Sequence, residues 1–393
     1  MKKDQFIIPK GMIYLDGNSL GPLPVAASKR IAQTVEDEWG EMLIKGWNQA
    51  GWMRQPSVIG DRIGKLIGAP AGSTTTGDTL CIKVYQALAS ALNMAPNNRK
   101  VVLSDSGNFP TDLYMAQGLL KTMDNGHELR IVDPEAVGAA LTDEIAVLML
   151  THVDYRTGRM HDMDALTQKA QAQGTIVIWD LAHSAGAVPL DMASSNAEFA
   201  VGCTYKYLNG GPGAPAFIYA RPDLLDQLQP ALSGWLGHEH PFAFDLDYRP
   251  GDGIERMRVG TPSILQLASL EAALDVWDGV DLQDIRKRSI VLSELFIREV
   301  EARCPQLKLA SPRNPQERGS QVSFHFDNGY AAMQALISRN VIGDFRAPDI
   351  MRFGFTPLYL EESDIIAAAE ILQDILDNDL WDTPEFKTKA AVT

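Results

Sequence analysis

Lys206 lies where an apolar run that favours β-structure, residues 199–205, gives way to the glycine-rich residues 210–213. A lysine at the end of a strand usually extends its ammonium group into water while its stem stays buried. The alternative is an amine that is held away from water as a nucleophile, since burial lowers the pKa of lysine. The other residues with chemical potential must decide between these two interpretations.

Asp180 closes a second apolar run, residues 175–180, and His183 follows three residues later. An aspartate in this position often caps the next helix, and taken alone it favours that reading. One further predicted strand separates Asp180 from Lys206, so we expect both side chains at the same rim of a sheet. A carboxylate and a lysine over one pocket suit pyridoxal phosphate (PLP): the amine bonds to the aldehyde, and the carboxylate keeps the ring nitrogen protonated.

A phosphate group needs backbone N–H groups at the start of a helix. Gly77, Asp78 and Thr79 begin an amphipathic helical segment whose first turn could hold a dianion. An ordinary helix cap at Asp78 explains the same residues equally well. Phe109 follows another predicted strand, where it could stack on a heteroaromatic ring or make a routine core contact.

Short apolar runs alternate with amphipathic segments between about residues 98 and 220. The predicted strands cover 101–105, 145–153, 175–180, 199–205 and 214–220, with helices at about 111–120 and 163–173. Continuous apolar runs with helices between them indicate parallel strands buried on both faces, in an α/β, doubly wound and mainly parallel sheet. Ligands of such sheets bind outside the carboxyl ends of the strands, where Thr151, Asp180 and the pair Tyr205-Lys206 stand.

The texture of the sequence changes after Gly260, where longer helical segments predominate. We predict helices near 262–278, 282–302, 329–338 and 361–377, a strand at 321–326, and an N-terminal helix over about 25–45. The expected division is residues 1–50 as an N-terminal segment packing with the small domain, 51–265 as the large PLP-binding domain, and 266–393 as a smaller C-terminal α+β domain. The last residues, 387–393, are typical of a frayed tail.

Composition excludes several classes of protein. The 393 residues carry a formal net charge of −15, which argues against a nucleic-acid or anionic membrane partner. No stretch approaches the ~18–20 apolar residues of a membrane span, and the N-terminus lacks the apolar core of a signal peptide. Three scattered cysteines, Cys81, Cys203 and Cys304, are too few for a disulfide framework or a zinc site. We expect a cytoplasmic protein without a metal.

Seven segments, spread from residue 14 to residue 359, resemble kynureninases in family order. They are YLDGNSLGPLP (14–24), FPTD (109–112), DLAHSAGAVPLD (180–191), YKYLNGGPG (205–213), LSGWLGH (232–238), RVGTPSILQLASL (258–270) and IMRFGFTPLY (350–359). The resemblance implies PLP fold type I and a homodimer. It also implies hydrolytic cleavage of L-kynurenine to anthranilate and L-alanine in tryptophan catabolism, with 3-hydroxykynurenine as a related substrate.

The resemblance also assigns roles to individual residues. Lys206 would bond to the cofactor and move the substrate α-proton, Asp180 would pair with the ring nitrogen, and Tyr205 would bind the phosphate and donate a proton. Arg352 would grip the substrate carboxylate, a task suited to a planar fork; without the resemblance it reads as an exposed strand arginine. The other implied cofactor contacts are Leu80, Cys81, Phe109, Pro110, Thr111, Asp112, Thr151, His183, Trp235 and Thr261, the last two lent in this fold by a second subunit, and the other implied substrate contacts are Trp47 and Ser19.

One departure and several alternatives stay open. Cys81 stands where the family usually has a phosphate-binding threonine, and a thiol is a weak hydrogen-bond donor, so Thr79 or the helix start must compensate. Trp47 matches the pattern of the bacterial members of the family, which is linked to a preference for kynurenine over 3-hydroxykynurenine as substrate. A class V aminotransferase or a cysteine desulfurase would use the same Lys206 and Asp180. A desulfurase also needs an exposed cysteine late in the chain, whereas Cys304 reads as structural. A non-enzymatic regulator on this fold ranks last.

Overall fold

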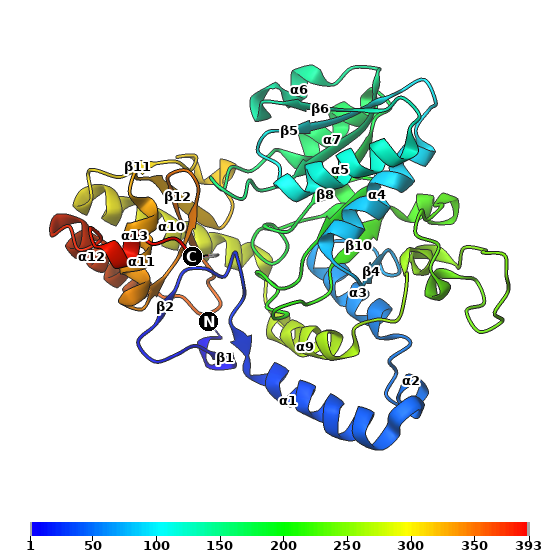
Figure 1. Ribbon diagram of the computed structural model, residues 1–393, viewed down its shortest axis with the longest axis horizontal. Coiled ribbons are helices and arrows are strands. Elements are labelled where there is room, and N and C mark those ends of the chain that lie inside the picture. The colour runs from blue at the N-terminus through cyan, green and yellow to red at the C-terminus, as the bar shows by residue number, and fades with distance from the viewer. Residues whose placement is uncertain (1, 391–393) are drawn as a thin grey trace.

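A seven-stranded sheet forms the larger part of the protein, which a computed structural model describes over residues 2–390 (Figure 1). The strand order is β4-β10-β9-β8-β7-β5-β6. The bounds are β4 Thr74–Thr76, β5 Val101–Asp105, β6 Glu128–Val132, β7 Ile145–Thr151, β8 Ile176–Asp180, β9 Phe199–Gly202 and β10 Phe217–Ala220. Strands β5 to β9 pair in parallel, which confirms the predicted α/β class.

Strand β10 runs antiparallel to both of its neighbours, β9 and β4, so the segment 214–220 was wrongly grouped with the parallel strands. The reason lies in the connection between β9 and β10. A parallel pair needs a crossover connection, usually a helix, whereas an antiparallel pair accepts a short return. The chain between Gly202 and Phe217 forms only turns, and Lys206 lies in this return.

Helices cover both faces of the large sheet, and its strands are therefore apolar on both sides. The covering helices include α3 (Gln55–Leu66), α4 (Leu80–Met94), α5 (Pro110–Met123), α7 (Met163–Ala172) and α9 (Ile264–Leu274). All seven residues of β7 are buried. In β8, Ile178 belongs to the core on one face and Trp179 to the core on the other, as alternation along a strand requires.

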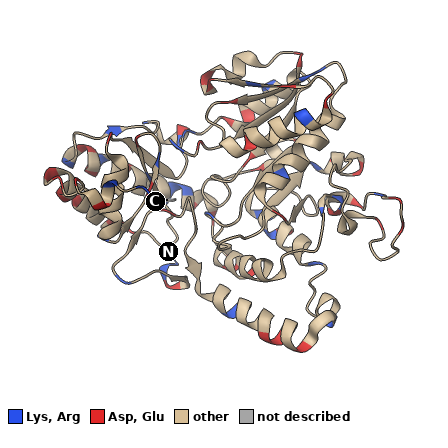
Figure 2. Ribbon diagram, in the orientation of Figure 1, with Lys and Arg blue, Asp and Glu red and all other residues tan. Residues whose placement is uncertain are grey.

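A second, antiparallel sheet of four strands forms the smaller unit, at the left of Figure 1. Its order is β11-β12-β15-β14, with β11 Lys308–Leu309, β12 Gln321–His325, β14 Asp344–Arg346 and β15 Ile350–Gly354. The helices that pack on it are α10 (Leu282–Arg303), α11 (Gly329–Ser338), α12 (Glu362–Asp377) and α13 (Pro384–Lys387). Acidic residues are frequent along α12 (Figure 2).

The N-terminal segment joins the smaller unit through a short parallel pair, β2 (Ile13–Tyr14) with β13 (Val341–Ile342). A hairpin-like contact of β1 (Phe6–Ile7) with β3 (Leu23–Pro24) precedes a long helical arm. The arm begins as α1 (Val25–Gln33), widens into a π-type segment over Thr34–Met42, and is followed by α2 (Gly46–Gln49). The prediction of one regular α-helix over 25–45 was therefore wrong, because the segment contains a π-type stretch and is divided into several helical pieces.

Other predicted elements hold with small shifts at their ends. The predicted strands ending at 153 and 205 stop at Thr151 and Gly202, because the chain turns there. Strands β4 and β6 were missed, since β4 is only three threonines and β6 is a half-exposed edge with charged residues. Of the predicted tail, Lys387 closes α13, and residues 391–393 lie outside the described range. None of the described helices has the length and apolar character that crossing a membrane requires.

Candidate active site

Three neighbouring strands of the large sheet end at one rim and bring the predicted residues together. Thr151 and Asp180 are register partners at the ends of β7 and β8, and Asp180 in turn pairs with Val201 of β9. Lys206 follows the end of β9 by four residues. The expectation that Asp180 and Lys206 meet at one edge therefore agrees with the strand order.

The Lys206 side chain points to a neighbouring imidazole. Its Nζ lies 2.7 Å from Nε2 of His183 and 6.0 Å from the centroid of the Phe109 ring. Burial lowers the pKa of Lys206, while the acidic neighbours Cys203 and Asp180 oppose this effect. The interpretation of Lys206 as a surface ammonium was thus the weaker one, and its amine is placed for chemistry at the rim.

Two buried carboxyl groups lie close enough to Lys206 to feel its charge. Burial raises the pKa of Asp180 to about 6, and Lys206 limits the rise. Burial also raises the pKa of Asp112, in the first turn of α5, well above its usual range, with the Asp180 charge adding to the effect. Because each negative charge disfavours the other, the two acids do not readily ionise together. Among the described residues, Oδ2 of Asp112 is buried without a hydrogen-bond partner.

The start of α4 offers the second feature expected of a phosphate site. Thr79 precedes the helix in an extended conformation, and no side chain caps this end. The first N–H groups of a helix have no intrahelical partner, so those at Leu80 and Cys81 can receive an anion. The alternative of a cap at Asp78 is wrong, because its carboxylate instead pairs with Lys83 Nζ at 3.1 Å.

These features fit the cofactor that the sequence resemblance implied. The unpartnered oxygen of Asp112 and the carboxyl of Asp180 suit a protonated ring nitrogen, and the uncapped start of α4 suits a phosphate. Phe109, at the entry to α5, is 39% exposed and meets Tyr155 edge-on at 5.1 Å, so one face of its ring is free to stack. Pro110 and Thr111 lie in the first turn of α5 behind it.

Arg352 lies at the centre of β15 and is 1% exposed, so its interpretation as an exposed strand arginine was wrong. Its Nε donates to Asp344 Oδ1 at 2.7 Å, and Nη2 donates to Ser19 Oγ at 2.7 Å and to Asp344 Oδ2. Nη1 donates to the carbonyl of Tyr155. Asp344 was not foreseen, and it holds one edge of the guanidinium group. The structure thereby brings Ser19 and Arg352 together, as the sequence suggested.

The remaining predicted residues lie in other surroundings. Trp47 sits on α2, at the far end of the arm (Figure 1), with its ring edge-on to Trp52 at 5.8 Å. Trp235 is 41% exposed on a single helical turn. Thr261 lines a cavity of about 50 Å³ that Gly77 and Asp78 also line. The hydroxyl of Thr151 donates to the carbonyl of Val153 at 3.5 Å.

Besides Asp344, sequence reasoning missed two residues of the site, and Gln321 is the first. It is the first residue of β12 in the smaller unit, and its side chain reaches His183 across the junction. No local pattern in the segment 321–326 predicts such a contact, because the contact forms only when the two sheets pack against each other. Gly21 is a second omission; its N–H donates to the carbonyl of Tyr205 at 2.7 Å, beside the lysine turn.

Solved structures with the same fold are distant in sequence. A cysteine desulfurase from Thermococcus onnurineus NA1 has a TM-score of 0.81 at 15% identity, covering 96% of this chain and 98% of its own. A variant of C-DES with glycine covalently linked to its PLP cofactor has a TM-score of 0.81 at 18% identity, over 95% and 99% of the two chains. These likenesses establish PLP fold type I for this chain.

Sequence relatives are much closer. The chain is 49% identical to a kynureninase of Burkholderia pseudomallei (strain 1106a) and 47% identical to that of Pseudomonas fluorescens, each alignment covering all of this chain and 95% of the relative. The family described as "Kynureninase C-terminal domain" matches residues 285–372, and the "DegT/DnrJ/EryC1/StrS aminotransferase family" matches residues 121–200. At this identity over its whole length, the chain belongs to the kynureninase family.

Proposed function

We propose that this protein cleaves L-kynurenine by hydrolysis to anthranilate and L-alanine, with pyridoxal phosphate as its cofactor. It is an enzyme that acts on a carbon–carbon bond. The observation that carries the proposal is the full-length identity of 49% to a kynureninase. The meeting of Lys206, His183 and two buried carboxyl groups at one rim supports it.

Five groups of this chain would hold the cofactor. Asp180 and Asp112 would receive the protonated ring nitrogen, and Phe109 would cover the ring. The uncapped start of α4 would bind the phosphate, with the phenol of Tyr205 beside it. When bound, pyridoxal phosphate supplies a ring that accepts electrons from the substrate α-carbon.

Lys206 is the residue that we propose moves the α-proton. The lowered pKa of its amine favours the neutral form that can accept a proton. Burial raises the pKa of the Tyr205 phenol, so this side chain stays protonated and can donate. Both groups belong to the same turn after β9.

Arg352 and Ser19 are the proposed contacts of the substrate carboxylate. Asp344 orients the guanidinium by accepting hydrogen bonds from its Nε and Nη2. The carboxylate would share the hydrogen bonds that Arg352 now makes to Ser19 and Tyr155. Trp47 is proposed to pack on the aniline ring and so to favour kynurenine over 3-hydroxykynurenine.

A homodimer is the assembly that we propose. Large apolar side chains are exposed on the arm and on the loop after Trp235, among them Ile44 at 77%, Phe244 at 76% and Leu246 at 102%. Such patches mark interaction surfaces. In the dimer, Trp47, Trp235 and Thr261 would complete the partner's site.

The division into residues 1–50, 51–265 and 266–393 is also proposed, since the pairing of β2 with β13 ties the first segment to the smaller unit. A cytoplasmic location is proposed because Cys81, Cys203 and Cys304 are all free thiols, as a reducing compartment favours.

The test is incubation of the PLP-loaded protein with L-kynurenine, with anthranilate followed by fluorescence and alanine by an enzymatic assay. Both products are expected in equal amounts, and Lys206→Ala is expected to yield neither. A protein that instead releases sulfide from cysteine, or transfers an amino group to a keto acid, would contradict the proposal. Cys304 argues against a desulfurase, because it is fully buried and burial raises the pKa of its thiol to about 12.

A further inference from the structure

The amide of Gln321 has its orientation fixed by its neighbours. Its Nε2 donates to the backbone carbonyls of Asp154 and Tyr155, at 3.0 and 3.2 Å. Its Oε1 lies 2.9 Å from Nδ1 of His183, and the residue has no exposed surface. A carbonyl oxygen can only accept, so the amide nitrogen must face the two carbonyls and the amide oxygen must face the imidazole.

This orientation determines which nitrogen of His183 carries the proton. Because the Gln321 oxygen cannot donate, Nδ1 must bear the hydrogen of the 2.9 Å contact. Burial keeps the pKa of His183 well below its usual range, with Lys206, Arg352 and Arg346 as cationic neighbours. The ring is therefore neutral, and Nε2 presents a lone pair to the Lys206 amine at 2.7 Å.

We propose that Gln321 is a positioning residue that holds His183 in its Nδ1–H form, so that Nε2 accepts a hydrogen bond from Lys206. The amine is thereby kept at a fixed place on the rim. Without Gln321, the ring could place its proton on Nε2, which would then donate to the lone pair of the neutral amine and withhold that lone pair from a substrate proton. The assignment of a tautomer stands by itself, whereas its effect on turnover depends on the proposed kynureninase activity.

The segment that carries Gln321 is fastened to the large sheet. Met160 N donates to the carbonyl of Glu317, and Gly319 N donates to that of Gly158, both at 2.8 Å. Ser311 Oγ donates to the carbonyl of Thr157 at 2.6 Å. These contacts join residues 311–319 to the loop that follows Asp154, whose carbonyl Gln321 binds.

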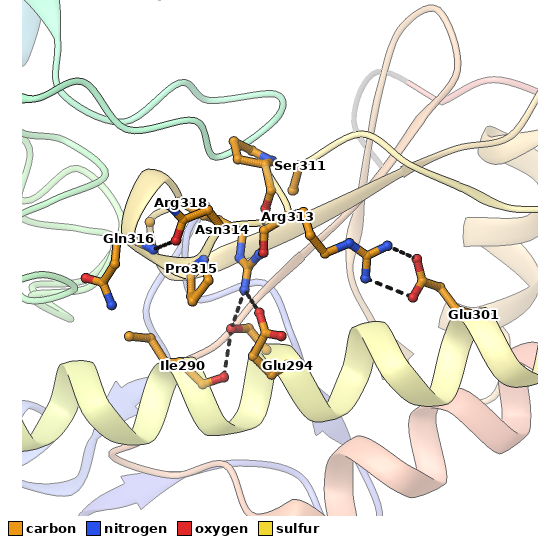
Figure 3. Close-up of polar contacts among 12 residues, drawn as sticks. Ile290, Glu294, Glu301, Ser311, Arg313, Asn314, Pro315, Gln316 and Arg318 are labelled. Carbon is orange, nitrogen blue, oxygen red and sulfur yellow. Dashed lines mark hydrogen bonds and ion pairs between the residues drawn. The ribbon is translucent and has the colours of Figure 1, made fainter.

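The same segment is braced from below by helix α10 (Figure 3). The buried Arg318 extends to Glu294 and Ser293 on that helix, and its Nη1 donates to the carbonyl of Pro312 at 2.6 Å. Arg313 pairs with Glu301 about two turns further along the helix. The segment from which Gln321 extends is therefore held firmly on both sides. A residue that orients another side chain needs such a fixed backbone.

The carbonyl of Tyr155 connects the two halves of the site. It accepts hydrogen bonds from Gln321 and from Arg352. The group that holds His183 and the group proposed to bind the substrate carboxylate thus share one acceptor on a loop of the large sheet. A change at Gln321 is expected to act on the amine side first, because Arg352 keeps Asp344 as its main partner.

The experiment is nitrogen-15 NMR of histidine side chains in the full-length protein, with and without pyridoxal phosphate. His183→Gln removes one of the seven histidine signals and assigns it. The wild-type spectrum without cofactor is expected to show a protonated Nδ1 and an unprotonated Nε2 at His183. A protonated Nε2 in that spectrum would overturn the inference.

Two substitutions test the part played by Gln321. Gln321→Met keeps the shape but removes the acceptor, and a change in the His183 tautomer is expected. Gln321→Glu keeps an oxygen that accepts, so the Nδ1–H form should persist. An unchanged His183 tautomer in Gln321→Met would overturn the proposal. If Gln321→Met does not fold, loss of the Nδ1–H form in Gln321→Glu would overturn it instead.

Kinetics separate this inference from the proposed function. Gln321→Met is expected to lower kcat by about tenfold, with little change in KM, because an aid to proton transfer is misplaced in part rather than lost. Thr175→Val is the control: it removes one buried hydrogen bond, to Ile145, at the other end of β8. Equal losses of kcat in both variants would overturn the positioning role. The expected tautomer in a wild-type protein that leaves kynurenine intact would instead refute the proposed activity alone.

Discussion

Gly21→Ala is a substitution whose effect can be worked out from the geometry of the lysine turn. An added Cβ at this position would lie 2.5 Å from the carbonyl oxygen of Lys206 and 2.7 Å from the Cα of Asn209. An ordinary van der Waals contact of a Cβ atom with another heavy atom has a distance of at least 3.4 Å. The obstacle is backbone rather than the end of a flexible side chain, so the turn must retreat by about 0.9 Å, the difference between 3.4 and 2.5 Å.

A displacement of this size acts on stability and on catalysis to different extents. Overpacking of a buried contact costs about 1–3 kcal/mol of unfolding free energy, which a large protein tolerates. A misplacement of about 1 Å at the reacting groups lowers the rate by about 10²-fold. We therefore expect Gly21→Ala to fold, to melt a few degrees lower, and to lose about 99% of its turnover of L-kynurenine.

The assay pairs a thermal melt with steady-state kinetics on cofactor-loaded protein. Gly118→Ala is the control, since its added Cβ meets nothing within 4 Å and the residue lies inside α5. That variant should gain about 1 kcal/mol from helix propensity and keep its turnover. Wild-type turnover in Gly21→Ala would refute the reasoning, because it would mean that the position of Lys206 is not set by this contact.

Three further predictions concern the cofactor site and the core. Asp180→Asn should retain the fold and lose turnover by roughly 10²- to 10³-fold, measured at equal cofactor content; near-normal turnover would contradict the role of the carboxylate. Cys81→Thr should slow the release of pyridoxal phosphate during dialysis, because a hydroxyl donates more strongly than a thiol; an unchanged rate would assign the phosphate to the helix start. Burial lowers the pKa of His152 to about 3, whereas the ordinary pKa of histidine in the unfolded chain is about 6.5. Between these two pH values the unfolded chain binds a proton at His152 and the folded chain does not. The free energy of unfolding therefore decreases as the pH falls. His152→Gln should reduce that slope by about 1.4 kcal/mol per pH unit between pH 6 and pH 4, where the unfolded histidine is mostly protonated. Urea unfolding at pH 6, 5 and 4 measures this, and an equal slope in both proteins would argue against this histidine.

The sequence predicted those parts of the site that depend on strand ends. Continuous apolar runs predicted β7 and β8. Because ligands bind at the carboxyl ends of parallel strands, Thr151 and Asp180 were expected at the same edge of the sheet, and they are register partners there. The position of Lys206 followed from the next run. Such inferences succeed because a buried parallel strand has a strong local signal and a fixed direction.

The missed features depend on contacts between distant segments. Asp344 binds Arg352 across two neighbouring strands of the small sheet, and Gln321 reaches His183 from one sheet to the other. The antiparallel course of β10 depended on the length of a turn rather than on its apolar residues. In each case the local sequence is compatible with several environments, and tertiary packing selects one.

The segment 14–24 explains how one short motif can serve both units of the fold. Gly21 leaves room for the turn that carries Lys206, and Ser19 binds both Arg352 and Asp344 in the small sheet. Gly354, beside Arg352, leaves space for Asn18, whose Oδ1 would lie 2.0 Å from an added Cβ. The spacing between the turn that carries Lys206 and the guanidinium of Arg352 is therefore set by a peptide of a few residues, which contacts the backbone of the turn at one end and the guanidinium at the other. Insertion of one residue between Ser19 and Gly21 would have to break one of these contacts, and it is therefore expected to impair the proposed binding of a substrate that reaches both Lys206 and Arg352.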